Sequence, residues 1–517
     1  FLSINFGEQI HGAFRSDTAQ AVNFIHQTVR DITSQLRQAR ALSVQEGRTI
    51  AVTYQPEIRR LVVEGGGHLN IPESLGVQWD AAERNTKTPP GAGMPIFVFS
   101  ADGGAAVVLD VVTGRVLALA SYPTYDPNSW EKGLTVQQAE DLFSEKKSVP
   151  ALNRSLQGLF APASTFKVVS VLAAASAGYD LNTNYKCPSQ VQVGTRAFQN
   201  FDSKNQGTMN MKKALAVSCD TIWYQIAFDE WLRDGGLRPK SNTNDYFFEA
   251  AKAFNITQKV GIDLPSESSS RLADRDYKKS WYQQNKDFYC NYKERATKAQ
   301  QTPFLLQLAA ENCVDGDKIR AGDAVNFSIG QGDTVVTPLK LTQMYAAIAN
   351  GGTIWQMMVA KAIVKTDGTV VKTFTPKKLG TVKTAPSTLS FLRSSLREVV
   401  ISGTGAGVFS GFPIEISGKT GTGQVFGRNP NGSLKDDTSW FASFAPSKNP
   451  RYAVVMMVGQ GGFGASTSGV GVRQIYSTLF GVVGNKVVPG AALFPEGKPP
   501  TQLPKISPAT KPKEASK

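Results

Sequence analysis

The stretch "GLFAPASTFKVVSVLAAASAGYD", residues 158–180, places a serine and a lysine three residues apart at the start of an apolar, alanine-rich run. On a helix, residues i and i+3 share one face, with Cβ atoms about 5–6 Å apart. Pro162 favours a first helical turn, where its missing N–H is tolerated. Ser164 and Lys167 would then lie side by side as nucleophile and base, near free N–H groups that stabilise an oxyanion. On its own, the pair is equally compatible with an ordinary helix in which the serine and the lysine have no catalytic role.

The base in this region cannot be a histidine. The chain has three histidines, His11, His26 and His68, and the sequence after Ser100 contains none. A Ser-His-Asp triad and a histidine-ligated metal are therefore excluded there, and any nucleophile needs another base. No metal or other cofactor is expected.

Two further short patterns hold residues that can do chemistry. The first, "AVSCDTIWYQIA", places Ser218 two residues before Asp220. The second, "ISGKTGTGQV", is expected to form a strand that offers a positive charge, hydroxyl groups and a glycine that lets a ligand approach the backbone. Its residues are Lys419, Thr420, Gly421 and Thr422. Alone, the first pattern has almost no specificity, and the second fits a surface loop.

The order of the three patterns is more specific than any one of them. S-x-x-K, an S-x-N-like triplet and K-T-G follow one another in penicillin-binding proteins, where the serine is acylated and a lysine replaces histidine. Residues 105–485 resemble the transpeptidase domain of class B penicillin-binding proteins, and "ASYPTYDPN", "NRSLQGLFAPASTFK", "FSIGQGDTVVTPLKLTQMYAAIANGG" and "GFPIEISGKTGTGQV" agree as well. The resemblance implies a peptidoglycan D,D-transpeptidase that works through an acyl-serine, is acylated by β-lactams, and serves cell shape or cell division.

The resemblance also implies a role for each residue. Ser164 attacks the penultimate D-Ala carbonyl of a stem peptide, and Lys167 is its general base. Ser218 and Asp220 belong to the proton relay and the substrate side. The backbone N–H groups of Ser164 and Thr422 form the oxyanion hole. Lys419 and Thr420 hold the terminal carboxylate of the substrate, helped by Thr422, and Gly421 belongs to the same substrate-binding strand.

Asp220 departs from the family, which usually has asparagine at this position. A free lysine has a pKa of about 10.4, too high for a base at neutral pH. Burial and the charge of Lys419 would lower the pKa of Lys167, whereas a carboxylate beside it would raise it. We therefore expect Asp220 to pair elsewhere, with Lys419 as the predicted partner.

Three alternatives remain at this stage. "STFK" also fits class D β-lactamases, and a D,D-carboxypeptidase would share the acylation step. A non-catalytic penicillin-binding sensor or structural fusion is the third, suggested by Asp220 and by the lack of a recognisable N-terminal pedestal. The long helical region and "GQGDTVVTPL" favour the transpeptidase.

Composition and charge indicate the surroundings. The net charge is +14, which suits either solubility or attraction to a polyanion such as cell-wall polymer. No nucleic-acid motif is present. No apolar run reaches the roughly 18–20 residues that span a bilayer, so we expect the membrane anchor to be absent from this chain. The resemblance implies an extracytoplasmic location in the cell envelope, either in the periplasm or at the outer face of the cytoplasmic membrane. Expected partners are stem peptides, β-lactams and, for an anchored full-length protein, a cell-wall polymerase.

The cysteines leave two possibilities open. None of the four falls in a C-x-x-C pattern, so zinc ribbons and thioredoxin chemistry are not indicated. Cys290 and Cys313 flank one polar segment and could pair in an oxidising compartment. Unpaired buried thiols are equally compatible with the sequence.

Apolar patterns predict the elements that position the site. Two strands around the turn Thr113-Gly114 come first, and "EISGKTGTGQV", "SWFASFAP" and "RYAVVMMVGQ" form three more near the end, followed by the helix "SGVGVRQIYSTLFGVVG". A long, mainly helical region lies between them. We predict an α+β penicillin-binding transpeptidase fold, with a mixed five-stranded sheet flanked by helices and a helical subdomain.

Residues 1–104 are predicted to form a separate domain. An amphipathic helix over 17–46 precedes the short strands "TIAVTY", "IRRLVVEG", "GVQWD" and "PIFVFS". "LRQARALSVQEGRTIAVTY" and "IFVFSADGG" resemble the globular part of a minor pseudopilin of type II secretion or type IV pili, although any small helix-plus-sheet domain also fits. The predicted transpeptidase domain spans 105–490, and the Pro/Lys-rich tail 491–517 is predicted to be disordered.

Overall fold

The computed structural model describes residues 103–130, 133–144, 147–298, 300–365, 369–425 and 434–493, together with short strands within residues 2–99. The chain divides into two compact units: Phe1–Gly104 with Val458–Gly462, and Ala105–Met457 with Phe463–Lys517. The helix predicted over 17–46 and nearly all of the predicted tail lie outside the described residues. Among the described helices, none has the length and apolar character needed to cross a membrane.

The first unit contains an antiparallel sheet of four strands in the order β4-β3-β2-β6. Three of the four predicted strands are confirmed as members of this sheet. The fourth, "GVQWD", forms β5, which pairs with β1 instead. The bounds are β1 Leu2–Ser3, β2 Ile50–Gln55, β3 Arg60–Val63, β4 His68–Asn70, β5 Gln78–Trp79 and β6 Pro95–Phe99.

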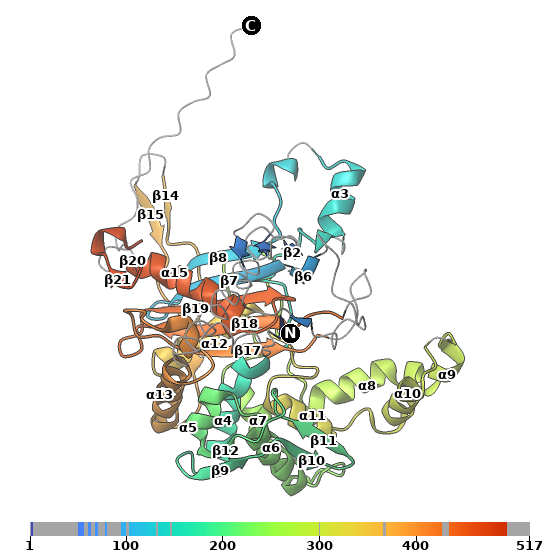
Figure 1. Ribbon diagram of the computed structural model, residues 1–517. Helices are drawn as coiled ribbons and strands as arrows, with labels where there is room; N and C mark the ends of the chain where they lie inside the picture. The colour runs from blue at the N-terminus through green and yellow to red at the C-terminus, as the bar shows by residue number, and fades with distance from the viewer. Residues whose placement is uncertain are drawn as a thin grey trace, which may run out of the picture. The chain divides into compact units, whose positions relative to one another are not determined.

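A five-stranded sheet has the strand order β17-β18-β19-β7-β8 (Figure 1). β17 and β18 pair antiparallel, and short turns join β18 to β19 and β7 to β8. The Val111 N–H, just after β7, donates to the Arg451 carbonyl, just before β19, at 3.0 Å. The predicted sheet is present, and its strands are antiparallel rather than mixed. Its strands are β7 Gly103–Asp110, β8 Val116–Tyr122, β17 Ser417–Gly423, β18 Thr438–Ala445 and β19 Tyr452–Gly459.

Both faces of this sheet are covered at its central strands β18 and β19, whose residues are almost all buried. Along β18, Trp440 and Ala442 pack in one core with helices α4 (Lys167–Ser176) and α12 (Pro338–Ala349). Phe441, which points to the opposite face, packs in a second core with α15 (Val470–Phe480). The helix predicted to close the domain is confirmed as a π-helical turn, Ala465–Gly469, that runs into α15.

The region between the early and late strands is mainly helical, as predicted. Helices α4 to α7 gather beside β17, whereas α8, α9 and α10 extend away from them (Figure 1). The remaining helices are α3 Val136–Phe143, α5 Met211–Val217, α6 Thr221–Arg233, α7 Tyr246–Lys252, α8 Arg275–Cys290, α9 Tyr292–Arg295, α10 Pro303–Asp315, α11 Ala321–Ser328, α13 Pro386–Ile401 and α14 Ala406–Phe409. Small hairpin strands include β9 Asn184–Cys187, β10 Gln190–Val193, β11 Arg196–Gln199 and β12 Gly207–Asn210.

All four cysteines form disulfides. Cys290, at the end of α8, is bonded to Cys313 on α10, so the pairing that the sequence left open is present. Cys187, the last residue of β9, is bonded to Cys219, which follows α5. The alternative of unpaired buried thiols is therefore wrong for both pairs.

Candidate active site

Ser164 lies on a short 3₁₀ turn, η5 (Ala163–Phe166), and Lys167 begins the α-helix α4 that follows. The sequence predicted a plain α-helical turn here, but the Lys167 backbone N–H instead donates to the Ser164 carbonyl in an i→i+3 pattern. Side chains at i and i+3 eclipse in a 3₁₀ helix, so both residues still point to one side. Ser164 is half-buried, and Lys167 is completely buried.

Neighbouring elements hold this turn in place. The Tyr345 hydroxyl of α12 donates to the Thr165 carbonyl at 2.9 Å, and the Ala163 N–H donates to the Gly330 carbonyl at 2.9 Å. Gly330 has φ +73°, and a Cβ on it would lie 2.4 Å from the Ala163 carbonyl oxygen. The loop before α12 therefore needs glycine to approach the turn that carries Ser164.

The Lys167 amine is surrounded by the second pattern. Its Nζ lies 2.5 Å from Asp220 Oδ1, 2.8 Å from the Ser218 carbonyl oxygen and 3.1 Å from Ser218 Oγ. Asp220 is itself buried, with 6% of its surface exposed. The expectation that Asp220 pairs with Lys419 is therefore wrong: its partner is Lys167.

Lys419 approaches the same hydroxyl from β17. Its Nζ donates to Ser218 Oγ at 2.9 Å and to the Thr420 carbonyl at 3.0 Å, and its side chain is completely buried. The Ser218 hydroxyl therefore lies between two buried lysine amines. β17 carries Lys419 inward because its pairing with β18 fixes the strand along its whole length.

Burial favours the neutral form of both amines. It lowers the pKa of Lys167, while the Asp220 carboxylate acts in the opposite direction without reversing the shift. The pKa of Lys419 lies well below its usual value, first because of burial and then because of the neighbouring Lys167 charge, with Asp220 again opposing. These directions for burial and Asp220 agree with those expected from the sequence.

The other side of the cleft is formed by β17 and the loop before α14. Thr420 Oγ1 lies 2.6 Å from Thr404 Oγ1, and the Thr422 hydroxyl accepts from the Gly464 N–H at 3.3 Å. A Cβ on Gly421 would lie 3.0 Å from Thr165 Cγ2, so β17 packs directly against the turn of the serine. Thr404 was missed by sequence reasoning, since "SGTGAG" carries no pattern that distinguishes it from a loop.

The predicted residues meet at one cleft of about 610 Å³, within the usual size range of small-molecule sites. Ser164, Ser218, Asp220, Thr420 and Thr422 line it, whereas Lys167 and Lys419 are buried behind them. At its rim the Phe201 and Phe463 rings have centroids 6.0 Å apart. Among the described residues, no cluster of three or more His, Cys, Asp and Glu side chains could hold a metal ion.

An antiparallel sheet covered by helices on both faces, with S-x-x-K, S-x-D and K-T-G meeting at one cleft, defines the serine acyl-transferring class of penicillin-binding folds. The family model described as the penicillin binding protein transpeptidase domain matches residues 104–477. The chain belongs to this family.

Individual relatives agree with this assignment. Peptidoglycan D,D-transpeptidase MrdA of Salmonella typhimurium (strain SL1344) is 26% identical over 400 residues, covering 73% of this chain and 55% of the relative. The chain thus spans little more than half the length of that protein. Pseudomonas aeruginosa PBP2 in complex with WCK 5153 is 25% identical with a TM-score of 0.57, covering 76% and 77% of the two chains. A chain from a structure of a peptidoglycan synthase complex that coordinates polymerization and crosslinking is 27% identical, with a TM-score of 0.57 and coverages of 75% and 57%.

Proposed function

We propose that this chain is a peptidoglycan D,D-transpeptidase that cross-links stem peptides through an acyl-serine at Ser164 and is acylated there by β-lactams. The observation that carries the proposal is the Ser218 hydroxyl, held 3.1 Å from Lys167 Nζ and 2.9 Å from Lys419 Nζ beside the turn of Ser164. A hydroxyl between two amines of lowered pKa can pass a proton from one to the other. The names of the relatives support the same activity.

In the acylation step, Ser164 Oγ bonds to the penultimate D-Ala carbonyl carbon while its proton moves to neutral Lys167 Nζ. The developing oxyanion lies between the backbone N–H groups of Ser164 and Thr422, which β17 brings to the serine turn. When the peptide bond breaks, the leaving amine takes a proton by way of Ser218 Oγ, and D-Ala departs. A β-lactam would enter the same path through its strained amide.

In the transfer step, an amine of a second stem attacks the ester carbonyl. Its proton passes to Lys167, which gives a proton to Ser164 Oγ as the ester C–O bond breaks, so that the hydroxyl and the neutral amine are both restored. During acylation Thr420 and Thr422 hold the terminal carboxylate of the donor, which departs with D-Ala, with Lys419 behind them and Gly421 leaving room for the ligand backbone. Thr404, hydrogen-bonded to Thr420, completes this surface.

The setting of this chemistry is also a proposal. The reaction requires a location outside the cytoplasm, where stem peptides are found, and the two disulfides suit an oxidising compartment. A polymerase that supplies the strands is the proposed partner, because the related synthase complex coordinates polymerization with crosslinking. The name MrdA of the curated relative favours a role in cell shape.

The domain boundaries that the sequence predicts are also part of this proposal. We place the transpeptidase domain at 105–490, a separate domain at 1–104 and a tail at 491–517. The family match begins at residue 104 and so does not bear on the earlier residues. Their pseudopilin-like character stays a prediction, because the antiparallel order of β4, β3, β2 and β6 fits any small helix-plus-sheet domain equally well.

A fluorescent penicillin tests the proposed activity. We expect one label per chain, placed by mass spectrometry on the tryptic peptide that contains Ser164, and no label on a Ser164→Ala variant. Label on Ser144 or Ser218 would contradict the assignment of the nucleophile. A chain that takes no label would favour the non-catalytic alternative.

The fate of the acyl group separates the enzymatic alternatives. We expect the penicilloyl ester on Ser164 to persist, and we expect the acyl group taken from a D-Ala-D-Ala peptide to be transferred to an added amine. Rapid hydrolysis of the penicilloyl ester would indicate a class D-like β-lactamase. Rapid hydrolysis of a D-Ala-D-Ala peptide, without transfer to the amine, would indicate a D,D-carboxypeptidase. Intact-mass measurements over time distinguish these outcomes.

A further inference from the structure

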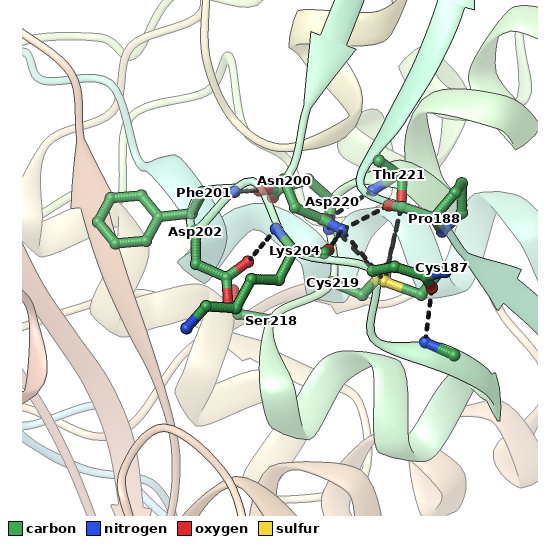
Figure 2. The surroundings of a disulfide bond; sticks show 12 residues. Cys187, Pro188, Asn200, Phe201, Asp202, Lys204, Ser218, Cys219, Asp220 and Thr221 are labelled. Carbon is green, nitrogen blue, oxygen red and sulfur yellow. Dashed lines mark hydrogen bonds between the residues drawn. A yellow bond between two sulfur atoms is a disulfide. The ribbon is translucent and has the colours of Figure 1, made fainter.

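The segment Ser218–Asp220 is held in place by a disulfide and by hydrogen bonds to Asn200. Cys219 lies between Ser218 and Asp220 and is covalently bonded to Cys187, with both sulfur-bearing residues completely buried (Figure 2). Ser218 adopts a left-handed backbone conformation, φ 60° and ψ 34°. Such a conformation costs a residue with a side chain about 1–2 kcal/mol, so it persists only where the surroundings enforce it.

Asn200 supplies a second fastening from the loop after β11. Its Oδ1 accepts from the Asp220 N–H at 2.8 Å and from the Thr221 N–H at 3.3 Å. Its Nδ2 donates to the Pro188 carbonyl at 2.7 Å and to the Lys204 carbonyl at 3.1 Å. Asn200 is 3% exposed, and the hydrogen bonds that it accepts from the Asp220 and Thr221 N–H groups are buried.

The two fastenings converge on the same short segments. Thr221 Oγ1 also donates to the Pro188 carbonyl at 2.9 Å, next to the disulfide. Residues 187–188 are thus tied to residues 219–221 by one covalent bond and by a direct hydrogen bond, and Asn200 bridges them (Figure 2). The neighbouring Phe201 N–H donates to Asp220 Oδ2 at 3.1 Å, so the same loop also orients the carboxylate.

We propose that the Cys187–Cys219 disulfide and Asn200 form a positioning clamp that places Ser218 and Asp220 against Lys167 for acylation. The inference rests on the proposed function and goes beyond it by naming residues that act through Ser218 and Asp220. Lys167 contacts Ser218 through both its carbonyl and its hydroxyl and Asp220 through Oδ1, so it meets residues on both sides of Cys219. A shift of the clamped segment would therefore disturb all three contacts together.

The chain offers a matched control for the disulfide. Cys290–Cys313 is a second disulfide of similar loop length, and it joins α8 to α10. We would compare the full-length double variants Cys187→Ser/Cys219→Ser and Cys290→Ser/Cys313→Ser with wild type. The measurement is the second-order rate of labelling by a fluorescent penicillin across pH, with thermal unfolding of each protein.

We expect the Cys187→Ser/Cys219→Ser variant to lose about 10- to 100-fold in its plateau rate, the usual effect of a displacement near 1 Å at a reacting group. Its rising limb should also move to lower pH, since a carboxylate that withdraws from Lys167 no longer raises the pKa of the amine. The Cys290→Ser/Cys313→Ser variant should keep both plateau and limb. Equal acylation by both variants and wild type at every pH would overturn the clamp.

Asn200 provides the test if the disulfide variant does not fold. Asn200→Ala should lower the plateau about tenfold and move the limb in the same direction. Asn205→Ala is its control, because Asn205 Oδ1 accepts from the Gly207 N–H at 2.9 Å in the same loop. A folded Asn200→Ala protein that matches the Asn205→Ala protein would contradict the proposal. A wild-type chain without label would instead overturn the proposed function, and this inference with it.

Discussion

At the scale of single residues, the Lys167–Asp220 pair decides when the base is free. Burial favours the neutral amine, and the carboxylate 2.5 Å away favours the ammonium. Removing Lys167 would leave Asp220 buried without a counterion, which costs about 3–5 kcal/mol in comparable pairs. Lys167→Ala is therefore a test of folding as much as of catalysis, and changing Asp220 is the cleaner experiment.

Asp220→Asn should shift the pH dependence of acylation to lower pH. Only neutral Lys167 accepts the Ser164 proton, so the rate rises as pH increases through the pKa of Lys167. The carboxylate raises that pKa, so an amide, which keeps an acceptor for the Phe201 N–H, allows the pKa to fall further. The measurement is the second-order rate of penicillin acylation from acid to alkaline pH.

The control for this variant is Asp202→Asn. Asp202 also lines the cleft, but its Oδ1 accepts from the Lys204 N–H. Its loss should leave the limb in place. A limb that stays unchanged in Asp220→Asn, or that moves to higher pH, would show that the ion pair does not govern the base.

At the scale of elements, the position of Ser164 is set by what packs against η5. β17 approaches from one side at Gly421, and α12 binds the turn through the Tyr345 hydroxyl. The loop before α12 contributes the carbonyl of Gly330, which accepts from the Ala163 N–H at 2.9 Å. Because β17, α12 and the loop before α12 all contact the short turn η5, a small shift of any one of these elements would move Ser164.

Gly330→Ala should separate this turn from its support. The new Cβ would lie 2.4 Å from the Ala163 carbonyl oxygen, and alanine is strained at φ +73°. We expect a loss of stability of about 1–3 kcal/mol and a fall of about 100-fold in acylation. Thermal unfolding and the rate of penicillin labelling measure the two effects.

Gly332→Ala separates strain from displacement. Its φ is +84°, but a Cβ there would meet Asn326 Cβ only at 3.7 Å, an ordinary contact. This variant should lose stability and keep its acylation rate. If both variants acylate at the wild-type rate, the Gly330 contact does not position Ser164.

At the scale of the whole molecule, the sequence predicts what is local and repetitive. Apolar runs, such as the one around Trp440 and Phe441, predict strands that are buried on both faces. The order of the three motifs predicts that Ser164 and Lys419 belong to one site. Contacts between distant segments carry no such signal. Asn200 lies in a polar loop whose sequence does not distinguish it from other loops. Asp220 pairs with Lys167 rather than with Lys419 because of side-chain distances that only the packed structure determines.

The last prediction concerns the independence of the catalytic unit. Every predicted site residue belongs to the unit Ala105–Met457 with Phe463–Lys517, and the family match begins at residue 104. A chain that begins at Gly103, the first residue of β7, keeps the complete five-stranded sheet and should therefore fold and be acylated at the rate of the full chain. Circular dichroism measures the folding of the shortened chain, and labelling by a fluorescent penicillin measures its acylation rate. Ser164→Ala in the same shortened chain gives the background labelling. A folded protein with a markedly lower rate would mean that residues 1–102 help to complete the site, because the sheet and its motifs would still be intact.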